Sequence, residues 1–167
     1  MFITTVRSEG LSHLSYILGD GGTGAVIDPR RDFSIYTEIA DENEIQITHI
    51  FETHRNEDFI SGAAALSAGT GSEVFHGGAL DFRYGTPVKK GNFFAFGDIR
   101  LVILETPGHT RESISIAVYD TGTGGPALGV FTGDLLFCGA TGRTDFYPDD
   151  PFDSPAEMYD SIVEKIF

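Results

Sequence analysis

The chain has 167 residues, 41% of them apolar, and a formal net charge of −14. This length is typical of one domain with its own core, and so strong a negative charge disfavours binding to nucleic acid. No apolar run is long enough to span a membrane, the N-terminus lacks the pattern of a secretion signal, and the single Cys138 excludes an intramolecular disulfide. We therefore expect one cytoplasmic domain over 1–167, with neither nucleic acid nor membrane as a partner.

Short apolar segments separated by turn residues predict four strands in the first third of the chain, at 2–6, 14–18, 24–27 and 47–51. The Gly21-Gly22 pair is typical of a hairpin between the second and third of them. Apolar residues at helical spacing predict a helix over 33–40. A second helix is predicted over 58–68, with Asn56 as a suitable N-cap.

The second half of the chain is again rich in predicted strands, at 73–76, 93–96, 99–104, 114–119 and 128–132. Pro87 argues against a central strand in 82–90. A helix is predicted over 152–167, with Ser154 and Glu157 as its capping box. Because strands outnumber helices and the two alternate, the pattern favours a layered α/β or α+β sandwich over a doubly wound sheet.

Polar residues follow three of the predicted strands directly, and we expect these residues to carry the chemistry. They are His54, His109 and Asp134. Two imidazoles and a carboxylate form the ligand triad of non-haem iron(II) enzymes, and the same ligand types also hold catalytic zinc. Residue types alone leave the choice between iron and zinc open.

The motifs around these residues resemble the successive metal motifs of the metallo-β-lactamase superfamily. They read Thr53-His54-x-x-x-Asp58, Thr106-Pro107-Gly108-His109-Thr110 and Phe131-Thr132-Gly133-Asp134. The stretch Gly142-Arg143-Thr144-Asp145-Phe146 is similar to the persulfide dioxygenase branch, which includes forms fused to rhodanese domains. The resemblance implies an α+β fold, a four-layer αββα sandwich that here lacks the family's C-terminal strands and helix. We expect a second copy of the chain to cover the exposed core, and a rhodanese domain in a longer parent protein.

The resemblance also implies a reaction and the residues that carry it. One Fe(II) per chain would be held by His54, His109 and Asp134. The reaction would oxidise a low-molecular-weight thiol persulfide with dioxygen to sulfite and thiol. Asp58 is expected to orient a ligand or a nearby backbone group. Arg143 is expected to orient Asp145 or to contact the anionic part of the persulfide, with a buried structural ion pair as the alternative.

Two residues depart from the superfamily's usual His-x-His-x-Asp-His elbow. Asn56 replaces its second histidine and Phe59 replaces its last. These histidines matter mainly where two metals bind, so their loss disfavours the alternative of a zinc-dependent, glyoxalase II-like thioester hydrolase. A further alternative is a non-catalytic, sulfur-handling domain of a rhodanese fusion protein. Cys138 is expected to be a small buried apolar residue.

Overall fold

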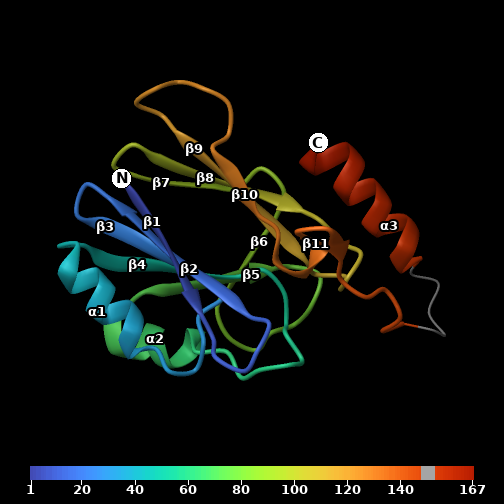
Figure 1. Cartoon of the computed structure of the whole chain (residues 1–167), viewed down its shortest axis with the longest axis horizontal. Helices are drawn as coiled ribbons and strands as arrows, with labels where there is room; N and C mark the ends of the chain where they lie inside the picture. Colours follow the sequence, from blue (N-terminus) through green and yellow to red (C-terminus); the bar gives the residue numbers. More distant parts are fainter. Residues whose placement is uncertain (148–152) are drawn as a thin grey trace.

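The first sheet contains six strands in the spatial order β1-β2-β3-β4-β5-β6. The computed structural model, which describes residues 1–147 and 153–167, is drawn in Figure 1. The strands are β1 (Phe2–Arg7), β2 (Leu14–Asp20), β3 (Thr23–Ile27), β4 (Gln46–Glu52), β5 (Glu73–Gly77) and β6 (Thr86–Val88). The first three strands are antiparallel, and β3 to β6 run parallel. Pro87 lies in the edge strand β6, where its missing N–H breaks no central ladder.

The second sheet is antiparallel, with four strands in the order β10-β9-β8-β7. They are β7 (Phe93–Phe96), β8 (Ile99–Glu105), β9 (Ile114–Asp120) and β10 (Gly129–Phe131). A 3₁₀ turn, η1 (Gly133–Leu135), follows β10. The chain then forms the small hairpin β11 (Leu136–Phe137) and β12 (Ala140–Thr141).

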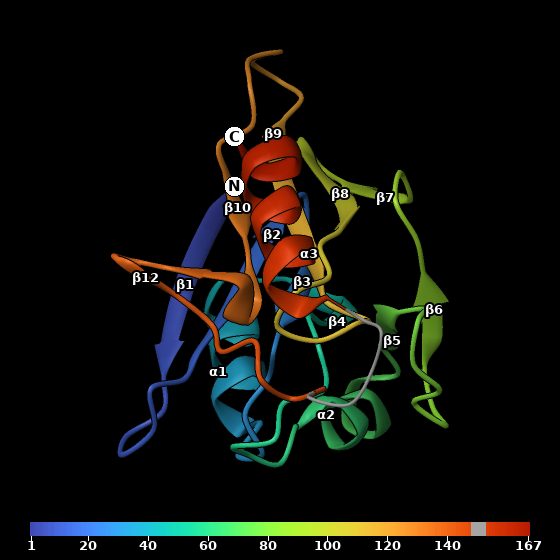
Figure 2. The same ribbon diagram turned by 90° about the vertical axis from the view of Figure 1, so that its right-hand side faces the viewer.

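Helices cover the outer faces of both sheets. Helices α1 (Ser34–Glu42) and α2 (Ala63–Thr70) pack on the first sheet, and α3 (Ser154–Asp160), continued by η2 (Ser161–Ile166), lies over the second (Figures 1 and 2). The layers are therefore α, β, β and α, and this confirms the expected four-layer sandwich. Among the described residues, no helix has both the length and the apolar character needed to cross a membrane.

Two apolar cores hold these layers together. One lies between the sheets and includes Phe51, Leu101 and Ile116; the other lies between the first sheet and its helices and includes Tyr36 and Leu66. All five side chains are fully buried. Burying each large apolar side chain contributes roughly 1.5–3 kcal/mol. The strand ends that carry the polar motifs are therefore anchored by buried strands on either side.

The second helix begins later than predicted. It starts at Ala63 rather than at residue 58, because residues 58–62 follow an irregular path tied to the loop after β3. The Gly62 N–H donates to the Pro29 carbonyl, and a Cβ at Gly62 would lie 2.0 Å from the Arg30 carbonyl oxygen. Asn56 is therefore not the cap of α2. Its side-chain oxygen instead accepts a hydrogen bond from the Asp58 N–H at 2.8 Å.

The N-cap predicted for the last helix is also wrong by one residue. The N-cap is Asp153, whose carboxylate accepts from the Ala156 N–H at 3.2 Å. The Ser154 hydroxyl is not free to cap, since it donates to the Gly108 carbonyl and so fastens α3 to the loop after β8. The predicted start of this helix at Phe152 lies outside the described residues.

Candidate metal centre

Three loops bring the predicted ligands to one edge of the sandwich. His54 lies two residues beyond the end of β4, His109 lies four residues beyond β8, and Asp134 lies in η1 after β10. The Thr53 carbonyl accepts a hydrogen bond from the Ile114 N–H at the start of β9, which ties the first loop to the second sheet. Residues far apart in sequence therefore meet where the two sheets come together.

The three side chains converge closely enough to share one cation. Asp134 Oδ2 lies 3.8 Å from His54 Nε2 and 3.6 Å from His109 Nε2, and one ligand atom from each residue lies within 4.8 Å of the others. The two imidazole rings are nearly perpendicular, with centroids 4.9 Å apart. Both histidines are buried, and Asp134 is partly exposed. In the part of the chain that the structure describes, this is the one such group of three.

A chain of hydrogen bonds fixes which nitrogen of His54 faces the other ligands. Asp28 accepts from Thr53 twice, from its backbone N–H at 2.7 Å and from its hydroxyl at 2.8 Å. When Asp28 is ionised, the Thr53 hydroxyl proton is used in this way, so Thr53 Oγ1 acts as acceptor for His54 Nδ1, 3.0 Å away. The proton of His54 is therefore on Nδ1, and the lone pair on Nε2 points toward Asp134 and His109.

His109 is oriented by the backbone rather than by a side chain. Its Nδ1 donates to the Arg143 carbonyl oxygen at 2.9 Å, so Nε2 again carries the lone pair. The Phe146 ring contacts the imidazole edge to face, with centroids 5.0 Å apart. The Gly-Arg-Thr-Asp-Phe stretch thus supports a metal ligand through one carbonyl and one aromatic ring.

The electrostatics of the site favour a neutral His54. Burial, together with the neighbouring His109, lowers the pKa of His54 to about 4. Burial raises the pKa of Asp134. Among the described residues His54 Nε2 has no hydrogen-bond partner although it is enclosed, and such an orphaned buried atom costs about 1–3 kcal/mol. A cation held among the three ligand atoms would satisfy it, so these residues fit a metal.

Two glycines allow this close packing. Gly133 has a φ of 51°, and a Cβ there would lie 2.4 Å from Thr53 Oγ1. A Cβ at Gly142 would lie 2.0 Å from the Asp134 carbonyl oxygen and 2.9 Å from His109 Nδ1. Side chains at either position would push the ligand loops apart.

The residues that replace the usual second-metal histidines are directed elsewhere. The Asn56 side chain closes a local turn with Asp58, and the Phe59 ring lies on the His13 ring with centroids 3.9 Å apart. Asp58 is exposed on the wall of the cavity described below and lies outside the three-ligand group. Its expected orienting role stays a prediction.

The Arg143 side chain lies apart from the triad. Its guanidinium pairs with Asp145 at 2.5 and 2.9 Å, and both side chains are more than 60% exposed, so the alternative of a buried ion pair is wrong. Its predicted role toward the substrate stays a prediction. The backbone role of Arg143 and the link from Asp28 through Thr53 were both missed by sequence reasoning. The Asp28-Pro29 pair signalled only a break in the sheet.

A cavity of about 630 Å³ opens beside the triad. Its lining includes His54 and Asp134 together with the apolar side chains Leu14, Phe131 and Phe137. Cys138 also lines this cavity and is exposed, so the expectation of a buried cysteine is wrong. The reason is its position in the exposed turn between β11 and β12.

Comparisons with known proteins agree with this fold. The metallo-β-lactamase superfamily model matches residues 9–166. The chain is 33% identical over 156 residues to the hydroxyacylglutathione hydrolase of Acaryochloris marina, covering 88% of the chain and 56% of that protein. It is 32% identical over 154 residues to the cytoplasmic hydroxyacylglutathione hydrolase of Arabidopsis thaliana, covering 89% of the chain and 56% of that protein. The chain thus spans about half the length of these curated relatives.

Solved structures give the same assignment. A metallo-β-lactamase from Staphylococcus aureus superposes with a TM-score of 0.90 at 33% identity, covering all of the chain and 53% of that protein. ETHE1 from Myxococcus xanthus superposes with a TM-score of 0.82 at 28% identity, covering 97% of the chain and 68% of that protein. The chain therefore belongs to the metallo-β-lactamase superfamily.

Proposed function

We propose that the chain is a single-metal enzyme that oxidises the outer sulfur of a low-molecular-weight thiol persulfide with dioxygen. The observation that carries the proposal is the isolated triad: His54, His109 and Asp134 converge, while Asn56 and Phe59 are engaged elsewhere. Such a triad is typical of non-haem iron(II) oxygenases. The structural likeness to ETHE1 and the Gly-Arg-Thr-Asp-Phe motif add support.

The overall reaction consumes one dioxygen and one water for each persulfide, and it yields sulfite and the free thiol. The outer sulfur loses four electrons, and dioxygen takes up all four, so no other oxidant is needed. Bound iron(II) would supply the activation of dioxygen. We propose iron as the metal, with zinc as the alternative that the same ligands permit.

The protein's own residues would hold and shield the reacting groups. His54 and His109 present neutral lone pairs, and Asp134 adds one negative charge that partly offsets a dication. Apolar side chains such as Phe131 and Phe137 line the cavity, where they would exclude water and hold the body of the thiol. We further propose that the Arg143 guanidinium meets an anionic part of the substrate.

A second candidate is hydrolysis of a hydroxyacylglutathione. The names of the curated relatives support this reaction more directly than they support persulfide oxidation. A hydrolase of this kind would use zinc, and Asn56 and Phe59 count against a two-metal version of it. The name of the Arabidopsis relative also supports our proposal of a cytoplasmic location.

Both reactions can be tested on one preparation. Protein loaded anaerobically with iron(II) is given glutathione persulfide, while oxygen uptake and sulfite release are followed. A second portion, loaded with zinc, is given a hydroxyacylglutathione and free thiol is measured. Sulfite released in step with oxygen uptake supports the dioxygenase. Thiol release without oxygen uptake supports the hydrolase instead, and inactivity in both assays supports a non-catalytic sulfur-handling domain.

Matched variants connect the activity to the site. Asp134→Asn removes a ligand charge, and Asp41→Asn removes the same charge from the exposed surface of α1. We expect the first variant to lose activity and the second to keep it. Equal activity in the two variants would contradict the assignment of the site.

A further inference from the structure

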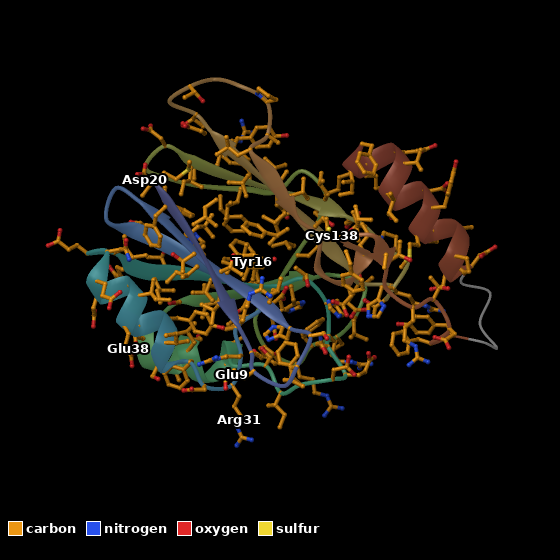
Figure 3. The ribbon with its side chains drawn as sticks, viewed as in Figure 1. Glu9, Tyr16, Asp20, Arg31, Glu38 and Cys138 are labelled. Atoms are coloured by element: carbon orange, nitrogen blue, oxygen red, sulfur yellow. The ribbon has the colours of Figure 1, made fainter. Side chains whose placement is uncertain are left out.

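Cys138 occupies an unusual place for the one cysteine of this chain. It lies with Gly139 in the two-residue turn between β11 and β12, because Phe137 pairs with Ala140 across the hairpin. Gly139 has a φ of 86°, which lets the turn close tightly. The thiol is exposed; Figure 2 shows the hairpin projecting from the body of the fold, and Cys138 is labelled in Figure 3.

The same turn forms part of the wall of the metal cavity. Cys138 lines the cavity of about 630 Å³ that also contacts His54 and Asp134, and it follows Asp134 by four residues. The ligand atom left unsatisfied in the metal centre also points to a ligand in this cavity. The His54 side chain is only 4% exposed, and its Nε2 has no partner among the described residues. An exposed nucleophile and an unsatisfied metal-ligating atom therefore line one space.

We propose that Cys138 is a sulfur-accepting site that holds a persulfide sulfur in the metal cavity. This inference rests on the proposed function. The Cys138 thiolate attacks the outer sulfur of a low-molecular-weight persulfide, the sulfur–sulfur bond breaks, and the carrier leaves with the electron pair as a thiolate. The product is a Cys138 persulfide. The exchange needs no oxidant, because one sulfur–sulfur bond replaces another.

The surroundings suit a stored persulfide better than a disulfide. The chain has no second cysteine to attack the new sulfur–sulfur bond, so it supplies no resolving thiol. The apolar Leu136 and Phe137 precede the thiol and line the same cavity. A sulfur held here would stay in the cavity that His54 and Asp134 also line until it is oxidised or returned to a carrier.

The loading step is tested by mass spectrometry on the 167-residue chain, loaded with iron and kept free of oxygen. Glutathione persulfide is added, and the gain of one sulfur atom on Cys138 is followed with time. The control is Thr123→Cys in a Cys138→Ser background, because Thr123 lies in the exposed β9–β10 loop and does not line the cavity. Each loading rate is divided by the rate at which iodoacetamide alkylates the same thiol, which corrects for exposure and thiolate content.

We expect the corrected loading rate to be roughly tenfold higher at Cys138 than at the control thiol, a difference of about 1.4 kcal/mol in activation free energy. Equal corrected rates would overturn the proposal, since Cys138 would then be an ordinary surface thiol. This readout requires no turnover of the loaded enzyme.

The second step is tested by admitting oxygen to the loaded protein after excess persulfide is removed. We expect loss of the Cys138 persulfide with release of one sulfite per chain, and no such loss from the persulfide at residue 123. If free glutathione persulfide is oxidised while the Cys138 persulfide persists, the storage role is wrong and the proposed function stands. If free persulfide is not oxidised at all, the proposed function fails, and only the loading rates then bear on Cys138.

Discussion

Replacing Asp28 with asparagine should weaken metal binding although Asp28 lies outside the ligand triad. The backbone N–H of Thr53 donates to Asp28, so in the variant it fixes the amide oxygen toward itself. The amide NH₂ then faces the Thr53 hydroxyl, which must accept from it and donate to His54 Nδ1. The proton of His54 would move to Nε2, the atom that has to bind the metal.

The size of the effect follows from this reversal. The substitution keeps the shape of the side chain and removes no ligand, so the loss comes mainly from the tautomer of His54, with a smaller part from the removed charge. Loss of such a supporting partner typically lowers metal affinity by about 10- to 100-fold. That corresponds to about 1.4–2.7 kcal/mol at 25 °C. A purely structural role for Asp28 would instead lower the free energy of unfolding and leave the intrinsic affinity unchanged.

Two measurements separate these outcomes. Competition with a chelating dye gives the metal affinity, and nitrogen-15 NMR of the metal-free protein, at a pH above the pKa of Asp28, shows which ring nitrogen of His54 carries the proton. Asp41→Asn, an exposed change of the same type, is the control. An affinity within about twofold of the wild type, with the proton still on Nδ1, would refute the proposed role of the Asp28–Thr53 link.

Four further outcomes are expected. Asp134→Ala should lose the metal in elemental analysis while its metal-free form melts no lower than the wild type, because burial raises the pKa of Asp134 and so opposes its charge. Gly133→Ala should lower the free energy of unfolding by about 2–4 kcal/mol in urea titrations, since a Cβ at φ 51° would lie 2.4 Å from Thr53 Oγ1. Arg143→Ala should change stability by less than about 1 kcal/mol and leave metal affinity unaltered in dye competition, because its ion pair is exposed and its carbonyl remains. Burial raises the pKa of Asp28 from 3.8 to about 7, so the metal-free protein should lose stability as pH rises from about 4 to 7. In urea titrations, the free energy of unfolding of Asp28→Asn should depend less on pH.

These outcomes have their own controls. Gly129→Ala introduces a Cβ with no atom within 4 Å and no positive φ, so it should leave the urea midpoint nearly unchanged. If Gly133→Ala behaves like Gly129→Ala, the close approach to Thr53 is not a constraint. A large loss of metal affinity in Arg143→Ala would show that the guanidinium, rather than the carbonyl, supports His109. If the free energy of unfolding depended more steeply on pH in Asp28→Asn than in the wild type, this would contradict the raised pKa of Asp28.

The layers and the ligands could be predicted from the sequence because both depend on local patterns. Apolar runs such as 47–51 and 99–104 correspond to real strands, and polar residues directly after them lie at the sheet edge. The ligands then converge because the loops after β4, β8 and β10 meet at one edge of the sandwich. The superfamily resemblance supplied the layer order, which periodicity alone left open.

What the sequence did not reveal depends on contacts between distant segments. The late start of α2 follows from the link between Gly62 and Pro29, which no local propensity encodes. The true cap Asp153 was missed because Ser154 binds a carbonyl from a loop more than forty residues away. Cys138 was expected to be buried from its residue type, whereas the hairpin geometry exposes it.

We propose above all that His54, His109 and Asp134 hold one metal ion. The most direct test is calorimetric titration of the metal-free protein with iron(II) under anaerobic conditions, repeated with zinc and with Asp134→Ala. We expect one high-affinity equivalent of either metal in the wild type and none in the variant. Two tight equivalents in the wild type, or one retained by Asp134→Ala, would contradict a single site at these residues.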